Sequence, residues 1–353
     1  MTKIRAAILG ATGMIGQRFV QMLQDHPYFE IEGLYASERS HGKTLRDVLK
    51  VRDFVYNDDT LDMKIETMDL KTISKSARLA FSGIPSDLAG KTESDLAESG
   101  VAVFTNAGAH RMDKDVPILI PEVNPEHLFS IKDQKTYKDG GYIITNANCS
   151  STGVAPPLKA LNDTFGLDIV HISTYQALSG AGYPGVPSLD AVGNVIPYIG
   201  GEEEKMETEL AKMIGTYKNK AFNFAEFDVF ANCARVPVID GHLEALTIKM
   251  KKVPSIDDVT DVMERFTSEA QSLKLPSAPV QPIIVRKEAN RPQPAFDVLA
   301  GTPDRAKGMA VTVGRIRKKG DYIKMFVLSH NTLRGGAGGS VLNAELAKAK
   351  GLL

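Results

Sequence analysis

The sequence has few cysteines, two in 353 residues, and their spacing matches neither a metal site nor a disulfide framework. It lacks any apolar run near the roughly 18 residues that a membrane helix needs. It also lacks an excess of charge, since the net charge is −1, so electrostatics gives no argument for nucleic acid or an anionic membrane as partner. These absences predict a cytoplasmic protein that binds no metal, no nucleic acid and no membrane.

The first part of the chain has the pattern of a dinucleotide-binding fold. An apolar run at 4–9 precedes a glycine-rich turn, and apolar residues at helical spacing follow it. Further strand-like runs alternate with polar or helical stretches, at 31–36, 79–81, 101–104 and 142–145. This alternation predicts an α/β fold with a Rossmann-like, doubly wound NADP-binding domain over residues 1–148.

The pattern changes from about Leu167 to long β-rich segments, separated by turns or by single helices such as one at 256–271. It predicts a catalytic and dimerisation domain of α+β type over residues 149–330, with a largely antiparallel sheet. Such a sheet can leave one face free to pack on a second copy, so we expect a homodimer or homotetramer. The Gly- and Ala-rich end of the chain predicts a helix, and residues 331–353 are expected to return to the first domain.

The stretch GATGMIGQRF at residues 10–19 is a G-x-x-G-x-x-G variant of the dinucleotide fingerprint. A tight turn without a ligand would share this pattern, but the strand before it and the helix after it favour a cofactor. After the second strand, ASERS at 36–40 offers hydroxyls and a guanidinium where an NAD site usually has an acid, and its own acid, Glu38, is the discordant residue that is expected to point away. These groups suit a ribose 2′-phosphate and predict NADP. The expected contacts are Gly10, Thr12, Gly13, Met14, Ile15, Ser37, Arg39 and Ser40.

Cys149 lies in NANCSSTGVAPP, residues 146–157. Most free cysteines are buried and act as small hydrophobic residues. Here the residues after the thiol are small and rich in hydroxyls, and then more apolar, which is typical of the start of a helix. The positive end of a helix dipole favours a thiolate, so Cys149 is a candidate nucleophile.

A thiolate that forms a covalent intermediate needs an acid/base partner. His26, His41 and His127 lie in polar, turn-like stretches typical of solvated surface histidines. His242 lies between two strand-like runs, seven residues after Arg235, a cation in an apolar segment. A buried arginine often binds a carboxylate with two hydrogen bonds. The residues alone leave these roles open.

Taken together, the motifs resemble the aspartate-semialdehyde dehydrogenase family, in its archaeal and fungal branch. They follow in the family's order from residue 10 to residue 339: GATGMIGQRF, ASERS, NAGAHRMD, PEVNPEH, NANCSSTG, QALSGAGYPG, GGEEEKMETE, RVPVIDGH and SHNTLRGGAGG. The series NANCS, QALSGAG and EEEK is far more specific than the glycine-rich loop. The resemblance implies reductive dephosphorylation of L-aspartyl-4-phosphate to L-aspartate 4-semialdehyde with NADPH, through a thioacyl-enzyme, in the synthesis of lysine, threonine, methionine and isoleucine.

The resemblance also implies roles for individual residues. Cys149 matches the nucleophile and His242 the acid/base residue. Gln176 matches the residue that orients substrate and nucleophile, and Arg235 the one that binds the substrate α-carboxylate. In GGEEEKMETE an acid binds the substrate amino group and a lysine binds phosphate. The remaining assignments are Glu202 and Lys205, with the register of the acids open, Arg111 as second phosphate ligand near Asn106, and Ser179, Gly180, Gly182 and Asn331 at the cofactor. As a hypothesis of our own, Asn148 and the N–H groups after the thiol hold an oxyanion.

Three alternatives compete with this prediction. A malonyl-CoA or succinyl-CoA reductase would keep the fold, the thiol and the base, but would need no EEEK element. A glyceraldehyde-phosphate or N-acetylglutamyl-phosphate type of reductase would lack the surroundings QALSGAG and GGEEEK. An NADP-sensing scaffold without enzymatic activity would have no reason to hold Cys149, Gln176, Arg235 and His242 together.

Overall fold

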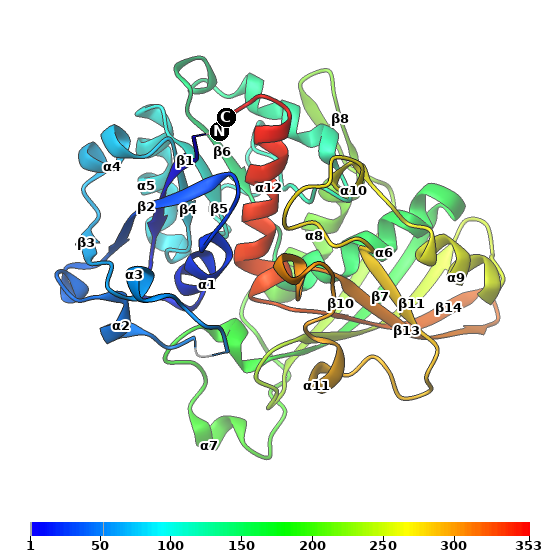
Figure 1. The fold of residues 1–353 in the computed structure, drawn as a ribbon. Coiled ribbons are helices and arrows are strands. Elements are labelled where there is room, and N and C mark those ends of the chain that lie inside the picture. The colour runs from blue at the N-terminus through cyan, green and yellow to red at the C-terminus, as the bar shows by residue number, and fades with distance from the viewer. Residues whose placement is uncertain (1, 52) are drawn as a thin grey trace. The chain divides into compact units, whose positions relative to one another are not determined.

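The computed structural model describes residues 2–51 and 53–353, which form two compact units (Figure 1). The first unit is made of the chain up to Leu119, His127–Asn146 and Gly336–Leu353. The second is made of Ile120–Glu126 and Ala147–Gly335. These limits differ from the expected ones because 120–126, 147–148 and 331–335 lie in the second unit. The assignment of cofactor binding to one domain and catalysis to the other stays a prediction.

The first unit contains a parallel sheet in the order β3-β2-β1-β4-β5-β6. Its strands are β1 Ile4–Leu9, β2 Phe29–Ala36, β3 Ile65–Thr67, β4 Leu79–Ser82, β5 Ala102–Thr105 and β6 Tyr142–Thr145. The residues of β4, β5 and β6 are all buried, as expected for parallel strands covered on both faces. The strand order reverses between β1 and β4, where open α/β sheets bind ligands. The predicted Rossmann-like fold is confirmed.

Helices cover this sheet, and the two most relevant are α1 Met14–Leu23 and α12 Gly338–Ala349. Helix α12 packs against α1 and β5, so the end of the chain from Gly336 onward belongs to the first unit (Figure 1). Its Gly- and Ala-rich surface permits this close approach, and nearly all its residues are buried. The other α-helices of the unit are α2 Leu45–Val48, α3 Asp58–Leu61, α4 Leu70–Ser76 and α5 Ser86–Glu98.

Two histidine predictions were wrong. His26 and His127 are fully buried, whereas His41 is exposed as expected. The ring of His26 is compatible with burial because its Nδ1 accepts the backbone N–H of Tyr28, while Nε2 lies 2.9 Å from Glu345 on α12. A partner 319 positions away leaves no trace in the local sequence pattern.

The second unit contains a sheet in the order β10-β7-β11-β14-β13-β12. The inner pairs β7–β11, β11–β14 and β14–β13 are antiparallel, while the edge strands β10 and β12 pair in parallel, so the sheet is mixed. Its strands are β7 Leu167–Gln176, β10 Asp228–Arg235, β11 His242–Met250, β12 Ile283–Arg286, β13 Val311–Lys319 and β14 Tyr322–Ser329. A small hairpin is formed by β8 Thr216–Lys218 and β9 Ala221–Asn223.

One face of this sheet packs under α6 Cys149–Phe165, and α8 Glu202–Ile214 packs on α6 and β10. Alternate residues of β11 are buried, as expected for a strand covered on one face. On the other face, β7 exposes His171, Ser173 and Tyr175. The single helix expected at 256–271 is two helices. The remaining helices are α7 Ser188–Ala191, α9 Ile256–Glu264, α10 Glu269–Ser272 and α11 Pro294–Asp297.

A buried ion pair fastens segment 120–126 inside the second unit. Arg334 donates from Nη1 and Nη2 to the two carboxylate oxygens of Glu122, at 2.6 and 3.1 Å. Both side chains are almost completely buried, so loss of either partner would leave an uncompensated charge.

Within the described residues, no helix is long and apolar enough to cross a membrane.

Candidate active site

Cys149 is the first residue of α6, which confirms its predicted position at a helix start. Asn148 is the N-cap, and its Oδ1 accepts the backbone N–H groups of Ser150 and Ser151 at 3.0 and 3.3 Å. The Sγ atom of Cys149 lies 3.2 Å from Nε2 of His242, the first residue of β11. A thiol, an imidazole and a helix N-terminus are thus combined in the second unit, as nucleophilic catalysis by sulfur requires.

The His242 ring is completely buried, and its Nδ1 accepts the backbone N–H of Ala177 at 3.0 Å. Burial of the ring, together with the nearby charges of Arg235 and His330, lowers the pKa of His242 to about 3. His242 is therefore neutral around pH 7.

This depressed pKa predicts an acid-dependent loss of stability. Above the ordinary value of 6.5, both folded and unfolded protein hold His242 neutral; between 6.5 and about 3, only the unfolded chain binds the proton. The free energy of unfolding should therefore fall as pH is lowered through this range, by at most about 1.4 kcal/mol per pH unit from this residue. Urea titrations of the wild type and His242→Gln at several pH values measure the difference. Parallel curves would contradict the prediction.

Arg235 and Gln176 end two neighbouring strands, β10 and β7, and are register partners. Both are buried, and Nη1 of Arg235 donates to the carbonyl of Ala177 at 2.7 Å. Burial lowers the pKa of Arg235, although an arginine stays charged at neutral pH. A Cβ on Gly180 would lie 2.8 Å from Nη1 of Arg235 and 3.1 Å from Cε1 of His242. The glycine therefore allows its loop to approach both side chains closely.

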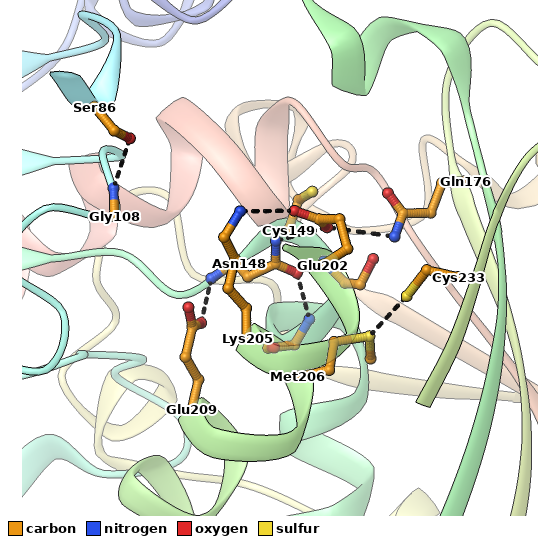
Figure 2. Close-up of polar contacts among 12 residues, drawn as sticks. Ser86, Gly108, Asn148, Cys149, Gln176, Glu202, Lys205, Met206, Glu209 and Cys233 are labelled. Atoms are coloured by element: carbon orange, nitrogen blue, oxygen red, sulfur yellow. Dashed lines mark hydrogen bonds and ion pairs between the residues drawn. The ribbon is translucent and has the colours of Figure 1, made fainter. Parts of the chain in front are cut away.

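Glu202 begins α8 and lies at the centre of the polar network in Figure 2. Its Oε2 accepts Nδ2 of Asn148 at 2.8 Å and Nε2 of Gln176 at 3.4 Å, and its Oε1 accepts Nζ of Lys205 at 3.1 Å. The adjacent Glu203 instead accepts the backbone N–H of Cys233. Glu202 is thus joined to Asn148 and Gln176, and its assignment as the acid that binds the substrate amino group stays a prediction.

The hydrogen bonding does not support the oxyanion hypothesis for Asn148. The N–H groups of Ser150 and Ser151 donate to the Asn148 side chain, and its amide nitrogen donates to Glu202. Asn148 instead caps α6 and links it to α8.

Sequence reasoning missed two carboxyl groups near the thiol. Glu209 on α8 accepts the backbone N–H of Asn148 at 2.7 Å, and its position seven residues after Glu202 would have placed it on the same helix face. Glu244 lies two residues after His242 on the buried face of β11. Burial raises the pKa of Glu244 well above its ordinary value, because the buried position disfavours the charged carboxylate.

The glycine-rich loop of the first unit has the properties of a pyrophosphate site. Gly10 has φ +79°, and a Cβ there would lie 2.8 Å from the carbonyl of Gly83. Gly13 is the N-cap of α1. In the described residues of this helix, the first turn has no acidic side chain. Its N-terminus therefore suits an anion. Thr12, Met14 and Ile15 are partly exposed there. The residues Ser37, Arg39 and Ser40 follow β2 directly, in and beside a short 3-10 helix at Glu38–Ser40.

The other predicted residues divide between the units. In the first, Arg111 donates from Nε to the carbonyl of Asn146 and from Nη2 to that of Asn106, both at 2.9 Å. In the second, Asn331 donates to Ser179 Oγ at 2.8 Å and accepts the backbone N–H of Gly241 at 2.9 Å. Asn331 therefore ties together two loops that flank His242. Gly182, in the same loop as Ser179, has φ +66°.

The fold and the thiol–imidazole pair define a class of protein: oxidoreductases in which a dinucleotide-binding unit accompanies a unit with a reactive cysteine. A family model described as "Semialdehyde dehydrogenase, NAD binding domain" matches residues 5–131. A second, described as "Semialdehyde dehydrogenase, dimerisation domain", matches residues 158–334. The chain belongs to the aspartate-semialdehyde dehydrogenase family. It is 46% identical to the Archaeoglobus fulgidus aspartate-semialdehyde dehydrogenase, with 96% of each chain covered, and 42% identical to that of Schizosaccharomyces pombe, with 99% covered.

Solved structures agree with this placement. The crystal structure of aspartate semialdehyde dehydrogenase with NADP from Candida albicans has a TM-score of 0.89 to this chain at 38% identity, with 99% and 100% of the two chains covered. The Vibrio cholerae aspartate semialdehyde dehydrogenase II has a TM-score of 0.77 at 27% identity, with 99% of both chains covered.

Proposed function

We propose that the protein reduces L-aspartyl-4-phosphate to L-aspartate 4-semialdehyde with NADPH and releases phosphate, a step in the synthesis of lysine, threonine, methionine and isoleucine. The observation that carries this proposal is the 3.2 Å contact between Cys149 Sγ and His242 Nε2 at the start of α6. Relatives named aspartate-semialdehyde dehydrogenase, which match this chain almost end to end, support the choice of substrate. The Candida albicans structure with NADP supports the choice of cofactor.

In this proposal the thiolate of Cys149 attacks the acyl carbon, and the C–O bond to phosphate breaks, leaving a thioester. Arg235 binds the substrate α-carboxylate, and Glu202 binds the ammonium group, since each side chain carries the complementary charge in a mostly buried position. Gln176 orients the substrate between them. Lys205 and Arg111 bind the phosphate. When bound, NADPH supplies the hydride that reduces the thioester; the loop Gly10–Ile15 would hold its pyrophosphate and Ser37, Arg39 and Ser40 its 2′-phosphate, with Ser179, Gly180, Gly182 and Asn331 as further contacts.

The nearest rival is a malonyl-CoA or succinyl-CoA reductase. Such an enzyme has no ammonium group to bind, and would not need the carboxylate of Glu202 beside Asn148 and Gln176. The deciding experiment offers the enzyme aspartate semialdehyde with phosphate and NADP, against malonyl-CoA with NADPH, and follows absorbance of the nicotinamide. A preference for malonyl-CoA would overturn the proposal.

Arg39→Ala tests the cofactor assignment. Arg39 is exposed directly after β2, where a guanidinium can pair with a 2′-phosphate. The KM for NADP should rise about tenfold or more, whereas the KM for NAD should change little, because NAD lacks that phosphate. Equal effects on the two cofactors would refute the role of ASERS in selecting NADP.

We also propose that the protein forms a homodimer or homotetramer through the face of the second sheet that exposes Tyr175 and Phe230, at 40% and 49% of their surface. Two exposed aromatics on neighbouring strands suit a protein–protein contact, and the matched family model is described as a dimerisation domain. Light scattering of the purified protein should give at least twice the chain mass. A stable monomer at micromolar concentration would contradict this.

The cytoplasm, whose reducing poise protects a reactive thiol, is the proposed location.

A further inference from the structure

Both ring nitrogens of His242 have a defined neighbour in the second unit. The Ala177 N–H donates to Nδ1 at 3.0 Å, and Nε2 lies 3.2 Å from Sγ of Cys149. A neutral imidazole has one N–H and one accepting nitrogen, and a nitrogen that accepts does not carry the proton. The single ring proton of His242 therefore lies on Nε2, directed at the sulfur.

The surroundings of the ring oppose a second proton. A proton on Nδ1 would face the donating N–H of Ala177. Arg235 and His330 disfavour an added positive charge, and with burial they lower the pKa of His242 to about 3. Glu244, on the same buried face of β11, has a pKa raised by burial, which disfavours its negative charge. Cys149 also lies against the ring, at Nε2, and as a thiolate its charge would favour an imidazolium; the Ala177 N–H opposes this, because it leaves no acceptor for a proton on Nδ1.

We infer that the Ala177 N–H fixes His242 as the neutral tautomer protonated on Nε2, and that His242 donates a hydrogen bond to the sulfur and the reacting oxygen without taking up a proton. The identity of the reacting oxygen rests on the proposed function, but the tautomer does not. Ala177 is a positioning residue, since it acts through His242.

The balance of the proposed reaction agrees with a donor. Sulfur enters as a thiolate and bonds to the acyl carbon while the C–O bond to phosphate breaks, and the one proton consumed ends on phosphate. Hydride then adds to the carbonyl carbon of the thioester, and the carbonyl oxygen becomes an alkoxide. The carbonyl reforms as the C–S bond breaks, and sulfur leaves as a thiolate. Sulfur therefore needs no base within the cycle, whereas the alkoxide needs a hydrogen-bond donor.

Nitrogen NMR of the unliganded enzyme tests the tautomer directly. Protein labelled with ¹⁵N at histidine is compared with His242→Gln to assign the His242 signals. We expect one protonated nitrogen, Nε2, and one unprotonated nitrogen, Nδ1, unchanged between about pH 8 and about pH 5, the range where an ordinary histidine titrates. An Nδ1–H pattern, or a doubly protonated ring within this range, would overturn the inference. Neither result depends on the identity of the substrate.

Three variants test the donor role. His242→Ala should lower kcat roughly 10²–10³-fold, the effect of removing one oxyanion donor. His242→Gln should recover at least about tenfold of this loss, because its amide nitrogen reaches the place of Nε2 but does not accept a proton. His242→Asn is the matched control, since its shorter amide reaches the place of Nδ1 and should be as slow as His242→Ala. Equal activity of the Gln and Ala variants would refute the donor role. Lack of turnover of aspartate semialdehyde by the wild type would instead refute the proposed function and leave the tautomer standing.

Discussion

Replacement of Cys149 by alanine should reduce NADP-linked oxidation of aspartate semialdehyde by on the order of 10⁴-fold or more, because in the proposed function the thioester forms on the Cys149 sulfur. Cys149 is at the start of α6 and partly exposed, so its removal should barely change the fold. Steady-state rates with saturating NADP and phosphate measure the effect, and the melting temperature checks the fold. Residual activity above about one per cent would sink the covalent mechanism.

The second cysteine supplies the matched control. Cys233 is 2% exposed, its Sγ lies 3.8 Å from the sulfur of Met206, and burial raises the pKa of its thiol to about 11. Cys233→Ala should cost stability through a small cavity but leave kcat close to that of the wild type. Iodoacetamide should label Cys149 in both proteins, and it should inactivate the wild type and the Cys233→Ala variant at the same rate. Labelling that leaves activity intact would be evidence against Cys149 as the nucleophile.

The sequence predicted the parts of the fold that depend on local pattern. The strand–turn–helix at residues 4–23 and the start of α6 at Cys149 follow from glycines, apolar spacing and residues typical of a helix start, all within a short window. The break between α9 and α10 depends on a weak signal: Ser268 forms a capping box with Gln271 near the end of the expected helix. The parallel pairing of the edge strands β10 and β12 had no local signal at all.

The site divides in the same way. The capping role of Asn148 could have been predicted, because Asn before a helix start is a preferred N-cap. The Ala177 N–H at Nδ1 of His242, and the buried carboxyl group of Glu244, could not have been. Both depend on how β7, β11 and α6 pack, and the chemistry of His242 depends on these contacts more than on its own residue type. The resemblance named the thiol and the imidazole, while the structure shows which nitrogen faces the sulfur.

Arg235→Lys should be the most damaging conservative change in the substrate site. Arg235 is held in a buried position by the Ala177 carbonyl, and in the proposed function it offers the substrate carboxylate two parallel N–H groups. Lysine keeps the charge but not the planar fork. Loss of a buried, charge-assisted contact costs about 2–5 kcal/mol, so kcat/KM for aspartate semialdehyde should fall on the order of 10²–10³-fold, chiefly through KM.

A truncated substrate separates this role from damage to the fold or to His242. An aldehyde with the amino group but without the α-carboxylate should be a poor substrate of the wild type, by a factor similar to that of the substitution. Arg235→Lys should then lose little more with the truncated aldehyde, because the two changes remove the same contact. If the variant loses its full 10²–10³-fold on this aldehyde as well, Arg235 acts through His242 or the loop at Ala177 rather than through the carboxylate. The rate of Cys149 alkylation in Arg235→Lys, compared with the wild type, then shows whether the thiol itself has changed.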